Sequence, residues 1–376
     1  MRIGIDVRYL SHGLMGGVHH YVAEFVPALI QAAIDHQIFL YADTKRPLEL
    51  QNLPSHVTVR YLPYQNELTS IYNDFFMHRQ MAQDRLEVVH FPANYGFGPP
   101  GARTIITLHD AINLHPLRQI INGLTYSNSK TPRNIIMMTY LHYCSRAAAR
   151  RADQILTISD YSRREIAHYS GLDSNRIVPV PHGVSTDIQP VRDETRLAKV
   201  QDRYQLCKPF ILADALKNPG VILRAWPLLP PEIREEVQIV FFCRRPDPLP
   251  AIHEAVTTGY AHLLIRPPFE DLIALYSMAK AFVFPSWIEG FGMPVLEAMI
   301  CGAPVIASDR GSIPEVAGDA ALLMDAEDEV TLARYMTNVL CNPAEAERLR
   351  QLGFARAAQF TWPNTARRIL DCYERG

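Results

Sequence analysis

Apolar runs and amphipathic stretches alternate along nearly the whole chain. Runs of four to six residues are too short for buried helices and predict strands; they lie at 2–7, 38–41, 57–62, 86–91, 104–108, 154–158, 177–180, 209–213, 237–242, 262–265, 281–284 and 320–324. Between them, apolar residues recur at helical spacing at 18–34, 133–151, 270–279, 329–340, 344–360 and 361–373. This alternation predicts an α/β fold with doubly wound parallel sheets.

Two segments leave their role open at this stage. Residues 114–131 show no clear periodicity and carry Pro116 and Gly123, so we expect a long loop, which inside a compact domain is usually functional or mobile. The helix at 133–151 mixes apolar residues with several arginines. It is either a core-facing helix with solvated arginines or a surface that docks on a membrane or an anionic lipid-linked ligand.

The chemistry is concentrated in residues 285–299, which directly follow an apolar strand. Gly290 and Gly292 bracket a tight turn, and Pro294 marks the first turn of a helix. Glycines let a ligand approach the backbone, and a helix N-terminus offers unpaired N–H groups that suit phosphate. The stretch therefore predicts a phosphate seat.

Glu289 and Glu297 flank this seat. A carboxylate beside a phosphate needs another partner, and ligand hydroxyls fit because an ionised carboxylate only accepts hydrogen bonds. A nucleotide sugar has hydroxyls at both ends and phosphate between them. The alternative is that Glu297 only complements the helix dipole and Glu289 is a solvated loop charge.

With seven residues between these glutamates and Gly-Phe-Gly-Met-Pro inside, the stretch resembles the Glu-x7-Glu signature of glycosyltransferase family 4. The similarity continues through residues 301–308 and 313–318. It implies the GT-B fold, in which two Rossmann-like domains face a central cleft, and retaining sugar transfer. It also implies that Glu289 binds the donor sugar and Glu297 the ribose. Further donor-binding residues implied in this stretch are Gly290, Phe291, Gly292, Met293, Pro294 and Val295.

The N-terminal half carries two further candidates. Gly16 and Gly17 follow the first strand, where the family leaves room for the donor phosphates. His109 and Asp110 end the strand at 104–108. Taken alone, His109 reads as a structural histidine, but the resemblance places it near the donor sugar as a catalytic residue. Asp110 would support it by fixing the imidazole tautomer.

The start of the second half departs most from the family pattern. Lys217 is present before Asn218 and would reach the diphosphate, but Asp214 stands where a glycine is usual and the loop is short. The usual arginine is missing as well. Arg244 and Arg245 are either its substitutes or solvated arginines.

Composition limits the remaining possibilities. The formal net charge of -2 argues against broad nucleic-acid binding. The six cysteines are dispersed without a CxxC pair, a strand stands at the very start, and no long apolar run is present. These features favour a cytoplasmic protein, at most peripheral on the inner face of a membrane. No residue cluster has zinc spacing, so no metal and no cofactor is expected.

The prediction is a retaining hexosyltransferase that moves mannose from GDP-mannose, favoured over a UDP-sugar, to a hydroxyl of a glycan or lipid-linked acceptor. We expect an acceptor-side domain at 1–183, a linker at 184–208, a nucleotide-sugar-binding domain at 209–355 and a returning helix at 356–376. Two alternatives remain: a degenerate homologue that binds without transfer, and a nucleotide-sugar epimerase. A bacterial surface-polysaccharide role follows from the likeness of Asp6-Val7-Arg8 and His109-Asp110 to such mannosyltransferases.

Overall fold

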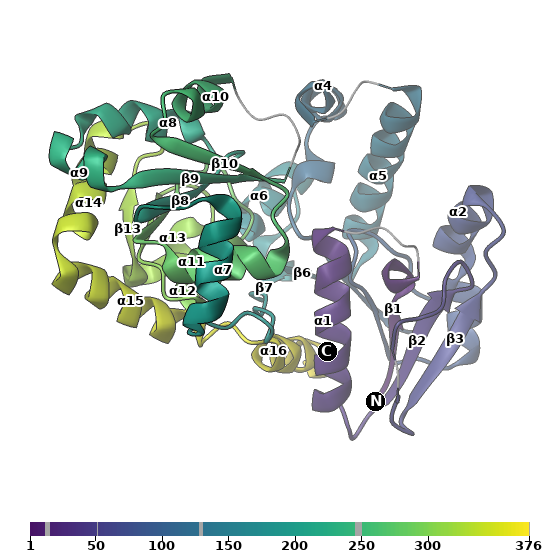
Figure 1. The fold of residues 1–376 in the computed structure, drawn as a ribbon. Coiled ribbons are helices and arrows are strands. Elements are labelled where there is room, and N and C mark those ends of the chain that lie inside the picture. Colours follow the sequence, from purple (N-terminus) through teal and green to yellow (C-terminus); the bar gives the residue numbers. More distant parts are fainter. Residues whose placement is uncertain (12–15, 51, 128–130, 245–249, 376) are drawn as a thin grey trace. The chain divides into compact units, whose positions relative to one another are not determined.

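The computed structural model describes the chain except residues 12–15, 51, 128–130, 245–249 and 376. The chain divides into two compact units (Figure 1). Unit 1 comprises Met1–Gly183 and Trp362–Gly376, and unit 2 comprises Val184–Thr361. Residues 184–208 thus group with unit 2, and the final segment groups with unit 1.

Unit 1 is built on a seven-stranded parallel sheet of order β3-β2-β1-β4-β5-β6-β7. Its strands are β1 Arg2–Asp6, β2 Gln37–Asp43, β3 Val57–Leu62, β4 Val88–Phe91, β5 Arg103–Thr107, β6 Gln154–Thr157 and β7 Ile177–Pro179. The central strands are buried on both faces, as near-continuous apolar runs require. Because all strands are parallel, their carboxyl ends share one edge, where ligands of such sheets bind.

Helices cover both faces of this sheet (Figure 1). They are α1 Gly17–Ala32, α2 Glu67–Phe76, α3 His78–Gln83, α4 Leu117–Ser127, α5 Pro132–Arg151, α6 Asp160–Ser170 and α16 Trp362–Glu374. Although α16 comes last in the chain, it packs against α1. Its buried Ile369 and Tyr373 share one apolar cluster with Phe25 of α1. The C-terminal helix is therefore part of the core of unit 1.

Unit 2 has a six-stranded parallel sheet of order β10-β9-β8-β11-β12-β13. Its strands are β8 Phe210–Asp214, β9 Gln238–Cys243, β10 Ala261–Ile265, β11 Ala281–Phe284, β12 Val305–Ser308 and β13 Ala321–Met324. Its helices are α7 Glu194–Tyr204, α8 Pro219–Ala225, α9 Pro231–Glu236, α10 Pro250–Thr257, α11 Phe269–Met278, α12 Met293–Ile300, α13 Ile313–Ala317, α14 Glu329–Cys341 and α15 Pro343–Ala357. The sheet is again doubly wound.

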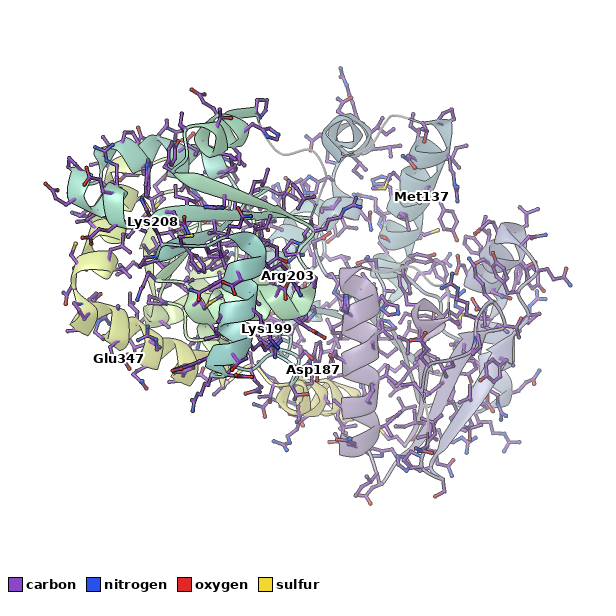
Figure 2. The ribbon with its side chains drawn as sticks, viewed as in Figure 1. Met137, Asp187, Lys199, Arg203, Lys208 and Glu347 are labelled. Atoms are coloured by element: carbon purple, nitrogen blue, oxygen red, sulfur yellow. The ribbon has the colours of Figure 1, made fainter. Side chains whose placement is uncertain are left out.

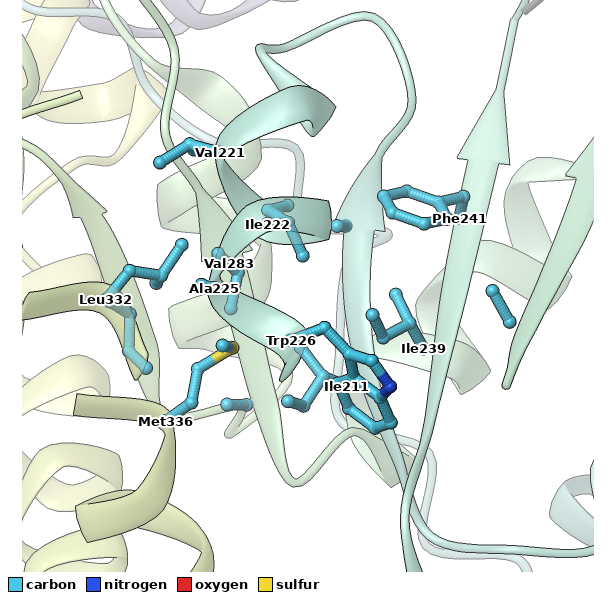
Figure 3. Packing of buried hydrophobic residues seen from close by; sticks show 14 of the residues in the cluster. Ile211, Val221, Ile222, Ala225, Trp226, Ile239, Phe241, Val283, Leu332 and Met336 are labelled. Carbon is cyan, nitrogen blue, oxygen red and sulfur yellow. The ribbon is translucent and has the colours of Figure 1, made fainter. Parts of the chain in front are cut away.

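The core of unit 2 is a continuous apolar cluster between strands and helices. Figure 3 shows Trp226 beside Ile211 and Ile239, and Met336 of α14 in the same cluster. Helix α7, which carries the Arg203 labelled in Figure 2, is tied to α11. Arg203 and the Tyr204 hydroxyl both donate to the Asp271 carboxylate, at 2.7 and 2.6 Å.

The strands predicted from apolar runs are confirmed, with ends that shift by up to two residues. The expectation of a loop at 114–131 is wrong, because α4 occupies Leu117–Ser127. Apolar residues at 117, 120, 121 and 124 do have helical spacing. Pro116 directly precedes the helix, and its carbonyl accepts from the amides of Gln119 and Ile120. Gly123 inside the helix is tolerated at a cost of about 1 kcal/mol.

Within the part of the chain that the structure describes, no helix is long and apolar enough to cross a membrane. Likewise, no group of three or more His, Cys, Asp or Glu side chains among these residues could hold a metal ion.

Candidate functional site

In unit 2, the turn after β11 holds the first predicted glutamate. Glu289 Oε1 accepts a hydrogen bond from the Ser286 hydroxyl at 2.8 Å and pairs with Lys217 Nζ at 2.6 Å. Its side chain is only 14% exposed. The structure therefore brings Lys217 and Glu289 together, although they follow different strands.

Residues that follow the neighbouring strand, β12, hold the backbone of Glu289. Its carbonyl accepts from the Ser312 amide at 3.1 Å and from the Ser312 hydroxyl at 3.0 Å. Gly311, with φ of +62°, lies so close that an added Cβ would be 2.5 Å from the Glu289 carbonyl oxygen. Only glycine fits there, for both reasons. Sequence reasoning missed Gly311 and Ser312, because their link to Glu289 depends on β12 lying beside β11 in the sheet.

Lys217 lies in a tight turn after β8. The Lys217 amide donates to the Asp214 carbonyl at 3.1 Å, and Asn218 takes a left-handed φ of +51°. The Asn218 side chain donates to the carbonyls of Pro285, at 3.1 Å, and Ala326, at 2.7 Å. Asn218 thereby ties the Lys217 turn to the start of the Glu289 turn.

Asp214 is buried at the end of β8, where the family pattern has glycine. Its Oδ1 accepts from the Leu216 amide at 2.8 Å, so the carboxylate is turned back onto its own loop. Burial raises the pKa of Asp214, while this hydrogen bond and the charges of Arg244 and Lys217 act against the rise. The short loop is thus closed by its own carboxylate.

The second glutamate, Glu297, lies on α12. Burial raises its pKa, against the opposing charge of Arg244 and the nearby hydroxyl of Tyr276, whose oxygen is 3.5 Å from Glu297 Oε2. Arg244 follows β9 and is exposed. It therefore influences both Asp214 and Glu297 at the carboxyl edge of the sheet.

The residues between the two glutamates form the turn and the start of α12. Gly292 has a φ of +97° and is the residue before the helix. The side chain of Phe291 packs at right angles on Phe360, and Val295 is fully buried. These two side chains belong to the core, which leaves backbone groups for any ligand. Gly290, Met293 and Pro294 are half-buried around the same turn.

In unit 1, His109 is buried beyond the end of β5. Its Nε2 donates to the Pro92 carbonyl at 2.9 Å, and the Tyr21 ring meets it edge-on at 4.8 Å. Burial lowers the pKa of His109, so the ring is neutral at pH 7. Its tautomer is set by Pro92 rather than by Asp110, whose Oδ1 accepts from the Ile112 amide at 2.9 Å.

The expected glycine pair opens α1. Gly17 begins the helix and Gly16 precedes it; among the residues that the structure describes, a Cβ added at either would meet no atom within 4 Å. That the two glycines leave room for the donor phosphates stays a prediction. Residues 12–15 of this loop lie outside the described part of the chain.

Sequence reasoning also missed a buried charge network in unit 1. Arg8 donates from Nε and Nη2 to the two oxygens of Asp6, at 2.9 and 2.8 Å, and from Nη1 to Asp74 at 2.7 Å. The hydroxyls of Tyr95 and Tyr140 reach the other oxygen of Asp74, at 3.0 and 2.6 Å. This network fixes the chain directly after β1.

Two family models match the sequence of this chain. The family model of glycosyltransferase family 4 matches residues 15–188, and that of glycosyl transferases group 1 matches residues 213–356. The O-antigen chain mannosyltransferase B of Escherichia coli is 36% identical over 232 residues, which are 59% of this chain and 61% of that protein. The serotype-specific mannosyltransferase WbdA of Escherichia coli is 31% identical over 284 residues, 73% of this chain and 33% of that protein. The matched segments thus cover less than two thirds of both relatives.

A solved structure shares the fold at low sequence identity. Anabaena HepE in complex with UDP-glucose superposes with a TM-score of 0.67 at 14% identity, covering 100% of this chain and 99% of that one. The two doubly wound units are those of the GT-B fold. With a family 4 domain followed by a group 1 domain, the chain belongs to the GT-B glycosyltransferases of family 4.

Proposed function

We propose that the chain transfers a hexose, with mannose favoured, from a nucleoside diphosphate sugar to a hydroxyl of a glycan or lipid-linked acceptor, with retention at the anomeric carbon. The observation that carries the proposal is the Lys217–Glu289 pair, held at the carboxyl edge of the unit 2 sheet by Ser286 and Ser312. A cation for phosphate beside a carboxylate for sugar hydroxyls is what such a donor needs.

In the proposed reaction, the acceptor hydroxyl oxygen forms a bond to the anomeric carbon. The bond from that carbon to the diphosphate oxygen breaks, and the hydroxyl proton passes to the departing phosphate oxygen. Lys217 and the N–H groups at the start of α12 stabilise the charge that develops on the leaving group. The atoms balance without a separate base and without a metal ion, which we do not expect the reaction to need.

The other predicted groups have supporting roles in this proposal. Glu289 accepts hydrogen bonds from sugar hydroxyls, and Glu297 accepts from the ribose. Arg244, which influences both Asp214 and Glu297, supplies positive charge at the same edge where the family's usual arginine is absent. His109 acts as a neutral imidazole near the sugar, since its pKa is lowered.

Mannose is favoured because both Escherichia coli relatives named above are mannosyltransferases. GDP is favoured over UDP as the carrier for the same reason, although the HepE structure holds UDP-glucose. The name of the first relative, an O-antigen chain mannosyltransferase, supports a glycan acceptor.

Incubation of the purified protein with GDP-mannose, UDP-glucose and UDP-galactose tests the proposal. We expect slow hydrolysis or transfer with GDP-mannose, an axial product linkage by NMR, and no loss of activity with EDTA. Binding of GDP-mannose without turnover would indicate the degenerate homologue, and conversion into a second nucleotide sugar would indicate an epimerase. No binding of any nucleotide sugar at millimolar concentration would refute the assignment.

A further inference from the structure

Helix α2 of unit 1 buries its polar side and exposes an apolar side. Its buried residues are Asn73 and Asp74. Four apolar residues at spacings of three and four form one stripe on its outer face and are exposed by 75%, 41%, 53% and 40%: Leu68, Ile71, Tyr72 and Phe75. A surface helix normally has the opposite arrangement, with its apolar stripe turned toward the core.

Buried hydrogen bonds hold the helix in this orientation. The Asn73 side chain donates to the Pro63 carbonyl at 2.9 Å. The Asp74 carboxylate accepts from Arg8 at 2.7 Å and from the Tyr140 hydroxyl at 2.6 Å. Turning the apolar stripe inward would leave these buried polar groups without partners, which is costly. The exposed stripe is therefore a fixed feature of the surface of unit 1.

The apolar stripe continues onto α5. The ring of Phe75 meets the ring of Tyr140 edge-on, with 6.3 Å between their centroids. Ile136 and Met137 stand four and three residues before Tyr140, so they project from the same side of α5, and they are 69% and 48% exposed. Six exposed side chains of the two helices thus make up one apolar surface: Leu68, Ile71, Tyr72, Phe75, Ile136 and Met137.

Two exposed arginines border this apolar surface, and aromatic rings hold both of them. Arg79 lies over the ring of Phe76, which directly follows Phe75, at 4.7 Å from the ring centroid. Arg151 lies over the Phe97 ring at 5.6 Å, and Phe97 stacks on Phe75 at 5.7 Å. The apolar surface therefore has positive charge at its edge.

The charge of the neighbouring chain indicates what covers the apolar surface. Residues 111–152, which include α4 and α5, contain five arginines, one lysine and no aspartate or glutamate. The exposed acid of α2, Glu67, pairs with Lys45 at 3.9 Å. A second copy of the chain placed on this surface would bring two basic segments together. An anionic bilayer instead offers hydrocarbon to the apolar side chains and phosphate to the arginines around them.

We propose that α2 and the first half of α5 form a docking surface for an anionic lipid bilayer. The apolar side chains enter the boundary between headgroups and acyl chains, and Arg79 and Arg151 contact headgroup phosphates. Tyr72 has the apolar body and polar tip that suit this boundary. The inference goes beyond the proposed function, because the bilayer contact needs neither donor nor acceptor.

Sedimentation with lipid vesicles tests the docking surface. The full chain is mixed with vesicles of phosphatidylcholine alone, or of phosphatidylcholine and phosphatidylglycerol in equal parts. We expect binding to the mixed vesicles to be at least about tenfold tighter, since each arginine near an anionic surface adds attraction. This binding should weaken as the salt concentration rises, because salt screens exposed charges.

Two double variants separate the apolar from the ionic contribution. Leu68→Gln with Ile71→Gln removes apolar surface while keeping good helix formers, and should weaken binding to the mixed vesicles about tenfold. Arg79→Gln with Arg151→Gln should also weaken it about tenfold and should flatten its dependence on salt. Circular dichroism and thermal unfolding check that each variant is folded.

Helix α14 of unit 2 supplies the matched controls. Val330 is 67% exposed, and Arg334 lies over the Tyr335 ring at 5.4 Å, as Arg79 and Arg151 lie over theirs. Val330→Gln and Arg334→Gln should bind the mixed vesicles like the wild type.

Several outcomes would overturn the inference. Equal binding to both kinds of vesicle, no binding to either, or wild-type binding by both double variants would remove it. Dimers detected by light scattering that Leu68→Gln with Ile71→Gln abolishes, without vesicle binding by the wild type, would assign the apolar surface to a second copy of the chain. Sugar transfer enters none of these measurements, so their failure leaves the proposed function untouched.

Discussion

Neutralising Glu289 should strengthen binding of the bare nucleoside diphosphate while strongly slowing transfer. In the free protein, Lys217 Nζ lies 2.6 Å from Glu289 Oε1, so the ammonium already has a carboxylate partner. A diphosphate must compete with that partner for the lysine. In Glu289→Gln the lysine is released, and the amide oxygen can still accept from the Ser286 hydroxyl, so the shape of the turn is preserved.

The magnitude follows from the geometry and the exposure. Two unit charges at 2.6 Å attract by about 6 kcal/mol at an effective dielectric of about 20. Most of this is offset by lost hydration and by solvent screening, because the Lys217 side chain is 34% exposed. For an ion pair that is partly exposed, a net attraction of about 1 to 2 kcal/mol remains. Removing it corresponds to roughly 5- to 30-fold tighter GDP binding. Turnover should fall by about two to three orders of magnitude.

Calorimetric titration of GDP into wild type, Glu289→Gln, Lys217→Met and the double variant measures this competition. Lys217→Met should weaken GDP binding, and in its presence Glu289→Gln should have little effect, because the competing pair no longer exists. Glu347→Gln on the surface of α15 controls for the loss of one negative charge (Figure 2). Unchanged or weaker GDP binding by Glu289→Gln would refute the competition, and normal transfer would refute the role of Glu289 on the sugar.

Three other substitutions test the surroundings of the site. Gly311→Ala should displace the Glu289 backbone and cut turnover at least tenfold. The control is Gly259→Ala, which is also at positive φ (+84°) but has no described atom within 4 Å of the added Cβ; it should cost about 1 kcal/mol of stability and no activity. Kinetics and urea unfolding measure both variants. Burial lowers the pKa of His90 to about 3, so the stability that the neutral ring contributes is complete above pH 6.5 and is lost as the pH falls toward 3. Between these pH values the unfolding free energy should drop by up to about 1.4 kcal/mol per pH unit. His90→Gln should remove this slope. Asp214→Gly should lower the unfolding free energy by about 2 kcal/mol without tightening GDP binding, since the carboxylate faces its own loop; a tenfold or larger gain in affinity would show that it intrudes on the diphosphate.

The fold could be predicted from the sequence because its signals are local. Each strand is a short apolar run, and most helices show helical spacing, so the α/β alternation is visible without any tertiary information. The wrong prediction of a loop at α4 also has a local cause. Gly123 and several polar residues interrupt the helical spacing of the apolar residues in this segment. The helices α2 and α3 were not predicted either.

The contacts of the site could not be predicted, because they join segments that are distant in the chain. That Lys217 pairs with Glu289, and that Ser312 holds the Glu289 carbonyl, depends on which strands are neighbours in the sheet. The direction of the Asp214 side chain could not be predicted for a related reason. A charge in place of glycine predicts repulsion only if its direction is known, and the amide of Leu216 sets that direction.

Strand order explains why these distant residues meet at one point. In unit 2 the sheet places β8, β11 and β12 side by side, with Val283 level with both Ala213 and Ile306. Parallel strands in such register end together, so the turns that follow them emerge at the same edge. The turn after β8 supplies the ammonium, the turn after β11 the carboxylate, and the turn after β12 the groups that hold that carboxylate in place. A one-residue insertion in any of these turns would move one of the three groups while the other two stay in place. We therefore expect such insertions to abolish transfer while leaving the sheet folded. Activity and circular dichroism measured on the same variant would show this difference.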